Sequence, residues 1–475
     1  MQLRPYQQDG KEQLYEAFKE GYKRVVYRLA TGGGKSVCFT DLILDAVRFG
    51  LPVVLCVKRR QLISQASEHL QREGVKHGVY MAGHRRFSPK ELVQICSIDT
   101  LEARNVYPNR YSNTLVIIDE SHDCTPKSRT YVKFVEAYKD NHIVGFTATP
   151  FTDNSLFQKI ICPIENYELR EQGFLVPERT FVPNVIDISG VSTKRNGEFN
   201  EKELFEVSAR KEIVGDFVRD WKLYANGRPT ILFAVNVEHS KIIAEAFNAA
   251  GIRAIHSDAK TKSAKRTHNI DRLVKGEIDV LCNVDIFSTG VDIPSTSCIQ
   301  LCRPTQSVVW HLQAIGRGLR PSIGTGKEDC LILDNAGNTL RHGTAYQPRE
   351  SSLEPRGKAS QGDDISIRAC KQCFLIMEQN VKQCPVCGFQ NPLVERIINH
   401  VEGDLVQYEM SEAELELMER KMITTDFHKL CYVAARNPKL KEWFVWQQLE
   451  KKYSVDRLSK YRDHLEIPPK IKDKL

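Results

Sequence analysis

Short apolar runs alternate with longer amphipathic stretches through most of the chain. In the first 150 residues the runs are Val25–Leu29, Val53–Val57, Leu115–Ile118 and Ile143–Phe146. Runs of about five mostly apolar residues between helical segments are typical of parallel strands buried on both faces. The alternation returns further on, at Ile231–Val235, Ala254–His256, Asp279–Val284, Ile299–Cys302 and Leu331–Leu333. The pattern predicts an α/β fold with two successive parallel-sheet domains.

Two stretches interrupt this alternation. Residues 151–208 are irregular and hold three prolines and a polar run, which indicates a connection that includes part of the second domain's first strand. Ser351–Asp364 has almost no apolar residues and predicts a linker. We therefore expect two α/β domains, a linker, a cysteine-rich module and a helical C-terminal segment, over residues 1–155, 156–350, 351–366, 367–395 and 396–475.

The composition fits a globular protein. Of 475 residues, 41% are hydrophobic and 27% are charged, which excludes a mostly disordered chain. No apolar run approaches the roughly 20 residues that span a bilayer, and the first residues lack the apolar stretch of a signal peptide. Ten of the 14 cysteines are scattered singly, as in proteins of a reducing compartment. We expect a cytoplasmic protein without a membrane partner.

A glycine-rich loop follows the first apolar run directly. Residues 30–36 have the sequence ATGGGKS, and a helical pattern begins at Ser36. In such a strand–loop–helix unit, backbone N–H groups and the helix N-terminus bind phosphate. Lys35 is then placed to reach the β and γ phosphates of ATP, and the Ser36 hydroxyl to bind Mg²⁺. The alternative is a glycine turn without a ligand, which the Gly-Lys-Ser sequence in this setting disfavours.

Two adjacent carboxylates end another predicted strand. The run Leu115–Ile118 leads straight into Asp119 and Glu120. An Mg-ATP hydrolase needs one carboxylate for the metal and a neighbour that orients and deprotonates the attacking water. We assign Asp119 to Mg²⁺ and Glu120 to the water. An exposed acidic turn is the alternative, and the phosphate loop upstream makes it the weaker interpretation.

Four cysteines form two CxxC pairs that are ten residues apart, namely Cys370 with Cys373 and Cys384 with Cys387. Four thiolates in this arrangement predict a closed tetrahedral Zn²⁺ site with no open position for catalysis. A redox pair is disfavoured because neither CxxC follows a strand of a thioredoxin-like unit. We expect a small zinc ribbon with a structural metal.

Several short sequences together resemble the superfamily-2 helicases, over about residues 1–345. In residues 119–122 (DESH), which are similar to the metal-binding motif of that family, only the third residue departs from the family pattern, so both carboxylates remain. The resemblance implies an ATP-hydrolysing enzyme with two tandem RecA-like domains. The segments are similar to motifs Q, I, II, III, V and VI of that family at residues 3–7 (LRPYQ), 30–36, 119–122 (DESH), 147–150 (TATP), 289–292 (TGVD) and 313–320 (QAIGRGLR).

The resemblance also implies site residues. Two arginines three apart on one helical face, Arg317 and Arg320, can both point across a cleft. An arginine from the facing domain stabilises the charge that develops on the γ-phosphate. With Lys35, Asp119 and Glu120 they complete the expected catalytic set. The residues expected to bind ATP and its Mg²⁺ are Arg4, Gln7, Thr31, Gly32, Gly33, Gly34, Lys35, Ser36, Asp119, Gly290 and Asp292.

Nucleic acid is expected along a different set of residues. Basic residues after the Val53–Val57 run resemble motif Ia and suit phosphate contacts, which carry no sequence information. A basic loop without a ligand is the alternative. The small hydroxyls of the following motif, and of motif V, suit phosphate oxygens. The expected contacts are Lys58, Arg59, Arg60, Ser97, Thr100 and Thr289.

Further segments, including residues 303–308, 316–320, 330–338 and 441–455, resemble the RadD-type DNA-repair helicases and related phage enzymes. This implies an ATP-dependent DNA helicase or translocase that acts on forks and junctions, including branch migration. It also implies a monomer that works with repair, recombination or replication proteins. The net charge of +7 permits a nucleic-acid partner without requiring one. Two alternatives stay open: an RNA helicase, and a non-unwinding, ATP-gated DNA-binding adaptor.

Aromatic residues mark the last segment of the chain. Trp443, Phe444, Trp446 and Tyr453 lie among lysines on an expected helix. Such aromatics can stack on splayed bases. We favour the simpler interpretation, in which they form a small helical core with the lysines outside.

Overall fold

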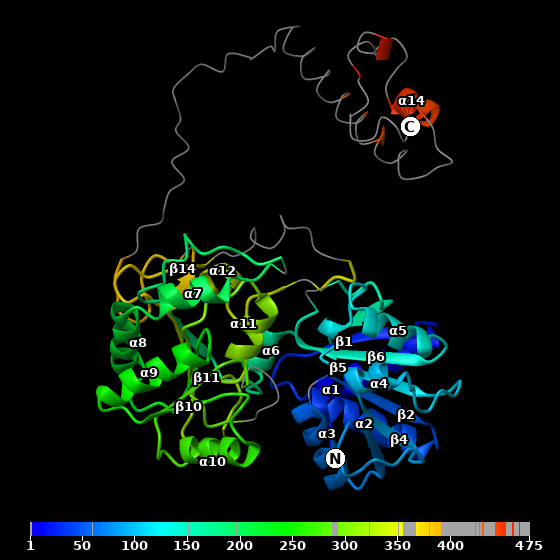
Figure 1. Cartoon of the computed structure of the whole chain (residues 1–475), viewed down its shortest axis with the longest axis horizontal. Coiled ribbons are helices and arrows are strands. Elements are labelled where there is room, and N and C mark those ends of the chain that lie inside the picture. Colours follow the sequence, from blue (N-terminus) through cyan, green and yellow to red (C-terminus); the bar gives the residue numbers. More distant parts are fainter. Residues whose placement is uncertain are drawn as a thin grey trace. The chain divides into compact units, whose positions relative to one another are not determined.

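Figure 1 shows the fold as a computed structural model. It forms two compact units, Met1–Leu393 and Val394–Leu475, which are described separately. The described residues are 2–58, 60–150, 153–195, 197–286, 293–322, 324–349, 351–354, 367–379 and 381–390, with residues 423, 427, 430, 431, 442–452, 458, 459 and 465 of the second unit.

The first unit contains a seven-stranded parallel sheet in the order β3-β4-β2-β5-β6-β1-β7. Successive residues of one strand belong to different apolar clusters, as Val25 and Val26 of β1 do. One cluster holds residues of α1, α2 and α3 and the other residues of α4 and α5, so helices cover both faces. The bounds are β1 Arg24–Arg28, β2 Val53–Val57, β3 His77–Tyr80, β4 Val93–Ser97, β5 Leu115–Asp119, β6 His142–Thr147, β7 Lys159–Ile161, α1 Pro5–Lys19, α2 Lys35–Arg48, α3 Arg60–Arg72, α4 Ile98–Arg104, the 3₁₀ turn η1 Ser121–Asp123 and α5 Arg129–Ala137.

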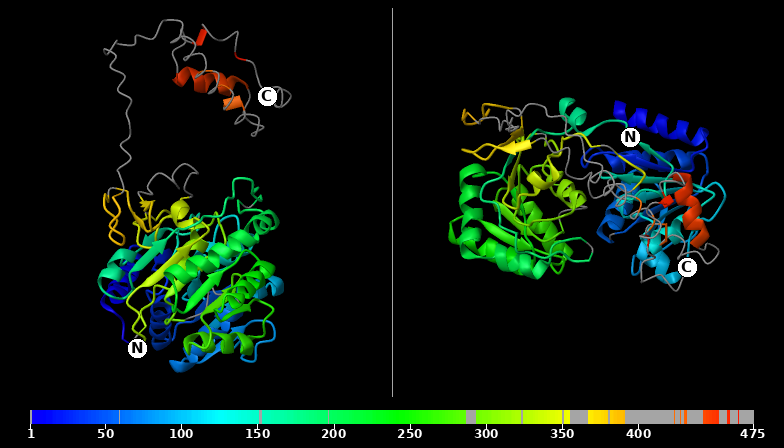
Figure 2. Two further views of the ribbon diagram at one scale, coloured as in Figure 1. Left: turned by 90° about the vertical axis from the view of Figure 1, so that its left-hand side faces the viewer. Right: turned by 90° about the horizontal axis from the view of Figure 1, so that it is seen from above.

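A second, six-stranded parallel sheet follows, in the order β10-β11-β9-β12-β13-β8. The two sheets lie side by side in the first unit, each flanked by helices (Figures 1 and 2). The predicted class, two successive parallel-sheet α/β domains, is confirmed. The bounds are β8 Glu178–Phe181, β9 Thr230–Phe233, β10 Ala254–Ser257, β11 Val280–Asn283, β12 Cys298–Leu301, β13 Cys330–Asp334, α6 Asn166–Glu171, α7 Glu201–Ser208, α8 Lys211–Tyr224, α9 Val237–Ala249, α10 Ser263–Val274, α11 Val308–Ile315 and α12 Asn338–His342.

The connection between the sheets contributes a strand to each. Strand β8 pairs with β13 at the edge of the second sheet, as expected for part of that domain's first strand. Strand β7 instead pairs with β1 of the first sheet. The first sheet therefore extends past residue 155, where we placed the domain boundary.

The cysteine-rich module packs on the second sheet. Its strands β14 (Ile367–Ala369) and β15 (Ile376–Glu378) form an antiparallel pair. An antiparallel bridge joins Phe181 of β8 to Leu375, and the N–H of Val182 donates to the carbonyl of Phe374 at 3.0 Å. The buried side chains of Cys370 and Cys384 belong to the same apolar cluster as Phe181. The module thus continues the edge of the second domain.

The start of the predicted linker contacts the first domain. The amide of Asn154 donates to the carbonyl of Ser352 at 3.0 Å, and Leu353 packs against the cluster beneath α4 and α5. The rest of this predicted linker, residues 355–366, lies outside the described residues.

The described part of the second unit has an apolar core. Helix α14 (Glu442–Lys452) supplies the buried residues Val445 and Leu449. Phe444 and Trp446 pack against this core, and the Trp446 ring lies 5.3 Å from that of Phe427. This supports the core interpretation for these two aromatics; the Trp443 side chain and Tyr453 lie outside the described residues. Among the helices described, none is both long and apolar enough to cross a membrane.

Candidate active site

The glycine-rich loop lies between β1 and α2. Gly32 and Gly34 both have φ +89°, a conformation that favours glycine. Helix α2 begins at Lys35, with Gly34 as its N-cap. The loop therefore meets the N-terminus of a 14-residue helix, where backbone N–H groups and the helix dipole favour an anion.

Residues from both domains crowd this loop. A Cβ on Gly32 would lie 3.0 Å from a methyl carbon of Leu175 and 3.1 Å from Cγ of Arg320. A Cβ on Gly316 would lie 2.8 Å from Cβ of Thr31. Small residues at these two glycine positions allow the second domain to approach the loop closely.

The two carboxylates follow β5 as predicted. Glu120 has φ +53°, a strained value for a residue with a side chain, and its N–H donates to Oδ1 of Asp119 at 3.0 Å. Burial and the charge of Glu120 raise the pKa of Asp119 to about 7. Burial opposes ionisation of Glu120, but the charge of Lys35 holds its pKa below the ordinary value. Burial lowers the pKa of Lys35, against the effect of both carboxylates.

A neighbouring strand holds Glu120 in place. Nδ1 of His122 lies 3.3 Å from Oε2 of Glu120 and 3.2 Å from the hydroxyl oxygen of Thr147, which ends β6. The same hydroxyl accepts the N–H of Thr149 at 3.0 Å. The segments resembling motifs II and III are thus joined through one histidine.

The second domain reaches the same carboxylate. Nε2 of Gln313, on α11, donates to Oε2 of Glu120 at 3.4 Å. Arg317 is buried, and the charges of Arg317 and Arg320 lower the pKa of Lys35. The expectation that both arginines share a helical face is wrong, because α11 ends at Ile315 and they lie in the following turn. The five expected catalytic residues nevertheless surround one site.

Asp119 and Ser36 are suited to a magnesium ion. A carboxylate, a hydroxyl and the oxygens of a bound phosphate are the hard donors that Mg²⁺ prefers. Such an ion would supply charge stabilisation on the β and γ phosphates, and Glu120 and Lys35 are the residues expected to act on the water and the phosphate.

The segment resembling the Q motif packs beneath the loop. Nε2 of Gln7 donates to the carbonyl of Gly33 at 3.1 Å, and its Oε1 accepts the N–H of Arg4 at 3.0 Å. The Tyr6 hydroxyl also donates to the Gly33 carbonyl, at 2.8 Å. Arg4 donates to that hydroxyl at 3.1 Å, so of the two predicted adenine residues Gln7 contacts the expected phosphate loop directly and Arg4 is linked to it through Tyr6.

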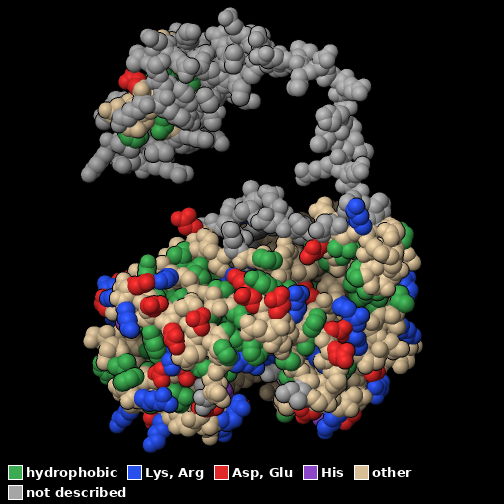
Figure 3. All heavy atoms as spheres, turned by 180° about the vertical axis from the view of Figure 1, so that it is seen from behind, with side chains coloured by type: hydrophobic (Ala, Val, Ile, Leu, Met, Phe, Trp, Pro, Cys, Tyr) green, Lys and Arg blue, Asp and Glu red, His purple; other side chains and the backbone are tan. Residues whose placement is uncertain are grey.

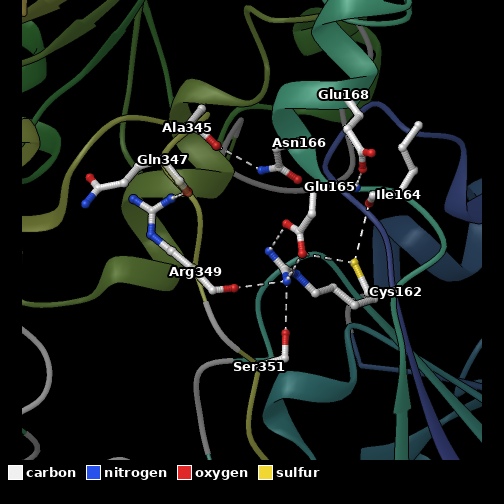
Figure 4. Close-up of polar contacts among 10 residues, drawn as sticks. Cys162, Ile164, Glu165, Asn166, Glu168, Ala345, Gln347, Arg349 and Ser351 are labelled. Atoms are coloured by element: carbon white, nitrogen blue, oxygen red, sulfur yellow. Dashed lines mark hydrogen bonds and ion pairs between the residues drawn. The ribbon is translucent and has the colours of Figure 1, made fainter. Parts of the chain in front are cut away.

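Arg28 joins three parts of the chain behind the loop. Its guanidinium forms two 3.0 Å contacts with the Glu165 carboxylate and donates to the Arg349 carbonyl and the Ser351 hydroxyl, each at 3.1 Å (Figure 4). Asn166 donates to the carbonyl of Ala345 at 2.9 Å. The chain runs between the domains near Glu165 and again near Arg349, and Arg28 bonds both segments to the end of β1.

The expected nucleic-acid residues follow β2 and β4. Lys58 pairs with Asp123 at 2.9 Å, and Arg60 donates to the Ala82 carbonyl at 2.5 Å. The buried hydroxyl of Ser97 caps α4 by accepting the N–H of Thr100 at 3.4 Å, so it serves the helix. The other expected residues, Arg59 and Thr289 for nucleic acid and Gly290 and Asp292 for ATP, lie outside the described residues.

The four cysteines converge as the spacing predicts. The sulfur atoms of Cys370, Cys373, Cys384 and Cys387 all lie within 4.8 Å of one another. Cys370 and Cys387 are 3.7 Å apart, and Cys373 and Cys384 are 3.5 Å apart. A set of four thiolates at these separations fits one tetrahedral Zn²⁺.

Gln313 and Phe174 are among the contacts of the site that were not assigned from sequence. Gln313 lies within the segment resembling motif VI, so the motif itself was the available signal. Phe174 lies in the irregular connection, and no local pattern marks it; its ring lies 4.4 Å from the Arg4 guanidinium carbon only because the chain folds back.

Comparisons with known proteins agree with this geometry. Residues 1–152 match the family "Type III restriction enzyme, res subunit", and residues 210–322 match "Helicase conserved C-terminal domain". A 51.5 kDa protein of a Lactococcus phage is 29% identical over 423 residues, which cover 86% of this chain and 88% of the phage protein. IRC3 of Saccharomyces cerevisiae, provisionally named an ATP-dependent helicase, is 29% identical over 70% of this chain but only 51% of its own length. A solved fragment assigned to an HsdR subunit of a type I restriction enzyme from Vibrio vulnificus has a TM-score of 0.56 at 18% identity, covering 75% of this chain and 67% of that one, and shows the fold.

Two RecA-like domains that close on a phosphate loop, a carboxylate pair and two arginines define an ATP-hydrolysing motor. The two family matches together cover more than half of the chain. The chain belongs to the superfamily-2 helicases.

Proposed function

We propose that this helicase is a DNA motor that acts on branched DNA, such as forks and junctions, in repair, recombination or replication. The observation that carries the proposal is the arrangement of residues along one edge of the first sheet. In the first domain, most residues expected to bind ATP follow β1 and β5, and those expected to bind nucleic acid lie at or after the ends of β2 and β4. Carboxyl ends of parallel strands meet at a single edge, which is where α/β proteins bind ligands.

One ion pair joins the two halves of this edge. Lys58 and Asp123 are both partly exposed, and such pairs contribute roughly 0–1 kcal/mol. A nucleic-acid phosphate therefore competes readily for Lys58. Asp123 ends the 3₁₀ turn η1, whose N-cap is Glu120. When Lys58 leaves Asp123 for a phosphate, the constraint on the segment that carries the catalytic carboxylate therefore changes.

The choice of DNA over RNA is supported by resemblance. The segments 303–308 and 441–455 resemble RadD-type enzymes, and the family matched by residues 1–152 is named for a restriction enzyme. On the face drawn in Figure 3, basic and acidic side chains are intermingled. On this face, that distribution favours local phosphate contacts over one broad basic surface.

The test compares substrates side by side. ATP hydrolysis is measured with single-stranded DNA, forked DNA, Holliday junctions and RNA, and strand displacement is measured on the same molecules. We expect the strongest stimulation and displacement on forks or junctions. Stronger stimulation by RNA would make the chain an RNA helicase. DNA-stimulated hydrolysis without displacement or translocation would favour the ATP-gated adaptor.

A further inference from the structure

Three consecutive residues of the domain connection lie along the nucleotide site. The Phe174 ring lies 4.4 Å from Cζ of Arg4. Leu175 is the nearest neighbour of a Cβ built on Gly32, at 3.0 Å. The N–H of Val176 donates at 2.9 Å to the carbonyl of Leu319, which precedes the catalytic Arg320. One short segment thus contacts the Q-motif arginine, the phosphate loop and the arginine-bearing turn.

The Arg4 guanidinium is held at two places. One face lies on the half-buried Phe174 ring, and Nη1 donates to the Tyr6 hydroxyl at 3.1 Å. Tyr6 packs edge-on against Phe174, with ring centres 5.2 Å apart, and is itself fixed by its hydrogen bond to Gly33. A free arginine side chain samples many rotamers. Because these contacts already order the planar group, less conformational entropy is lost when a base stacks on it.

Gln7 is already engaged. Its carboxamide binds the Gly33 carbonyl on one side and the Arg4 N–H on the other. The second N–H and the second oxygen lone pair of Gln7 remain for a base, but Gln7 is only 3% exposed. The Arg4 guanidinium is more accessible for stacking, because Arg4 as a whole is exposed.

We propose that Phe174 is a positioning residue for the adenine of ATP: it holds the Arg4 guanidinium flat, so that the base stacks on the opposite face. Because Leu175 and Val176 continue from Phe174 to the loop and to Leu319, base binding then also depends on the connection between the domains. The proposal rests on the ATP site and not on the choice of nucleic acid.

The experiment measures binding of Mg-ATP and of Mg-tripolyphosphate, which lacks the base, to the full chain without nucleic acid. Phe174→Leu keeps the apolar volume but removes the ring, and Phe174→Tyr keeps the ring. We expect Phe174→Leu to bind ATP about tenfold more weakly and tripolyphosphate nearly as the parent does. Phe174→Tyr should stay close to the parent for both.

A double-mutant comparison tests whether Phe174 acts through Arg4. Arg4→Ala should lose about as much ATP affinity as Phe174→Leu, and the double variant should lose little more. Phe87→Leu is the matched control, because Phe87 packs edge-on against Tyr80 at the same 5.2 Å but lies away from the loop. Parental ATP binding by Phe174→Leu would overturn the proposal. Equal losses for ATP and tripolyphosphate, or additive losses in the double variant, would make Phe174 a structural residue instead.

Discussion

Gln313 of the second domain donates a hydrogen bond from Nε2 to Oε2 of Glu120 in the first domain, at 3.4 Å. The same carboxylate oxygen lies 3.3 Å from Nδ1 of His122. Glu120 also sits at a strained backbone position, with φ +53°. The residue expected to activate water is therefore positioned by both domains, and its geometry depends on how they close.

Glu120→Gln tests the assignment of the catalytic base. The amide keeps the size of the side chain but cannot take a proton from water, while Lys35 and the Mg²⁺ residues remain. We expect ATP binding within about threefold of the parent and hydrolysis reduced by roughly 10²-fold or more. Lys35→Ala should weaken nucleotide binding itself. Near-normal turnover by the Glu120 variant would refute the assignment.

Arg320→Ala tests whether the second domain completes the site. Arg320 packs against the phosphate loop beside Gly32, where its charge can stabilise the γ-phosphate as it leaves. We expect the rate of nucleic-acid-stimulated hydrolysis to fall by about 10²-fold, with nucleic-acid binding retained. Arg219→Ala, on the exposed face of α8, is the matched control. If both variants hydrolyse ATP at the parental rate, the site is not shared between the domains.

Asp123→Asn tests the ion pair proposed to join ATP and nucleic acid. Without the carboxylate, Lys58 is free for phosphate and η1 loses one constraint. We expect about two- to fivefold tighter binding of single-stranded DNA at low salt, since exposed pairs of this kind are weak. Basal hydrolysis without DNA should rise. Asp140→Asn, an exposed acid after α5, controls for the change in net charge. If both variants have an equal effect, the effect of Asp123→Asn comes from the change in net charge and not from loss of the ion pair.

Much of the fold follows from the apolar runs. Two strands that escaped prediction, β3 and β4, contain buried polar residues that bond to nearby groups. In β3, one ring nitrogen of His77 lies 2.8 Å from the Ser67 hydroxyl and the other 2.8 Å from the Val75 carbonyl. In β4, the buried Gln94 donates to the carbonyls of Ser88 and Glu91. Such residues look like surface positions in a sequence, because the loop that satisfies them cannot be read from hydropathy.

The chemistry of the site followed from short motifs, since strand ends and their neighbouring residues are contiguous in sequence. The contacts of Phe174 and Asp123 did not. Phe174 meets Arg4, and Asp123 meets Lys58, only through tertiary folding. Residues that tune a motif from a distant segment have no local signal of their own.

We predict that Glu178 makes the stability of the second domain depend on pH. Burial raises the pKa of this β8 carboxyl from about 4.5 to about 7, although the N–H of Ala345 donates to its Oε1 at 3.0 Å. The native state therefore holds a proton that the unfolded state has lost between those values, so stability falls as pH rises from about 4.5 through 7. We expect Glu178→Gln to flatten this dependence and to be more stable than the parent above pH 7, by roughly 1–3 kcal/mol. Urea unfolding at pH 5 and pH 8 measures the difference; an unchanged pH slope would contradict it.

Two shortened chains separate the cysteine-rich module, the expected zinc ribbon, from the second unit. We predict that the ribbon stabilises β8. It covers this edge strand through the bridge of Leu375 to Phe181 and the hydrogen bond from the N–H of Val182 to the carbonyl of Phe374. A chain ended after Glu354 exposes this edge, and a loss of about 2 kcal/mol would lower its Tm by roughly 4–8 °C. A chain ended after Leu393 retains the whole first unit and should keep the parental Tm.

The longer of these chains also tests which part chooses the DNA structure. The expected motor contacts at Lys58, Arg60 and Thr100 are to phosphates, which distinguish a fork from a single strand poorly. We therefore expect the chain ended after Leu393 to keep ATP hydrolysis stimulated by single-stranded DNA and to lose its preference for forks and junctions. Cys373→Ser in the full chain shows whether the zinc site contributes separately, with metal content as the check. If the chain ended after Leu393 unwinds forks as well as the full chain does, the second unit does not select the substrate, and the preference must come from the motor or the ribbon.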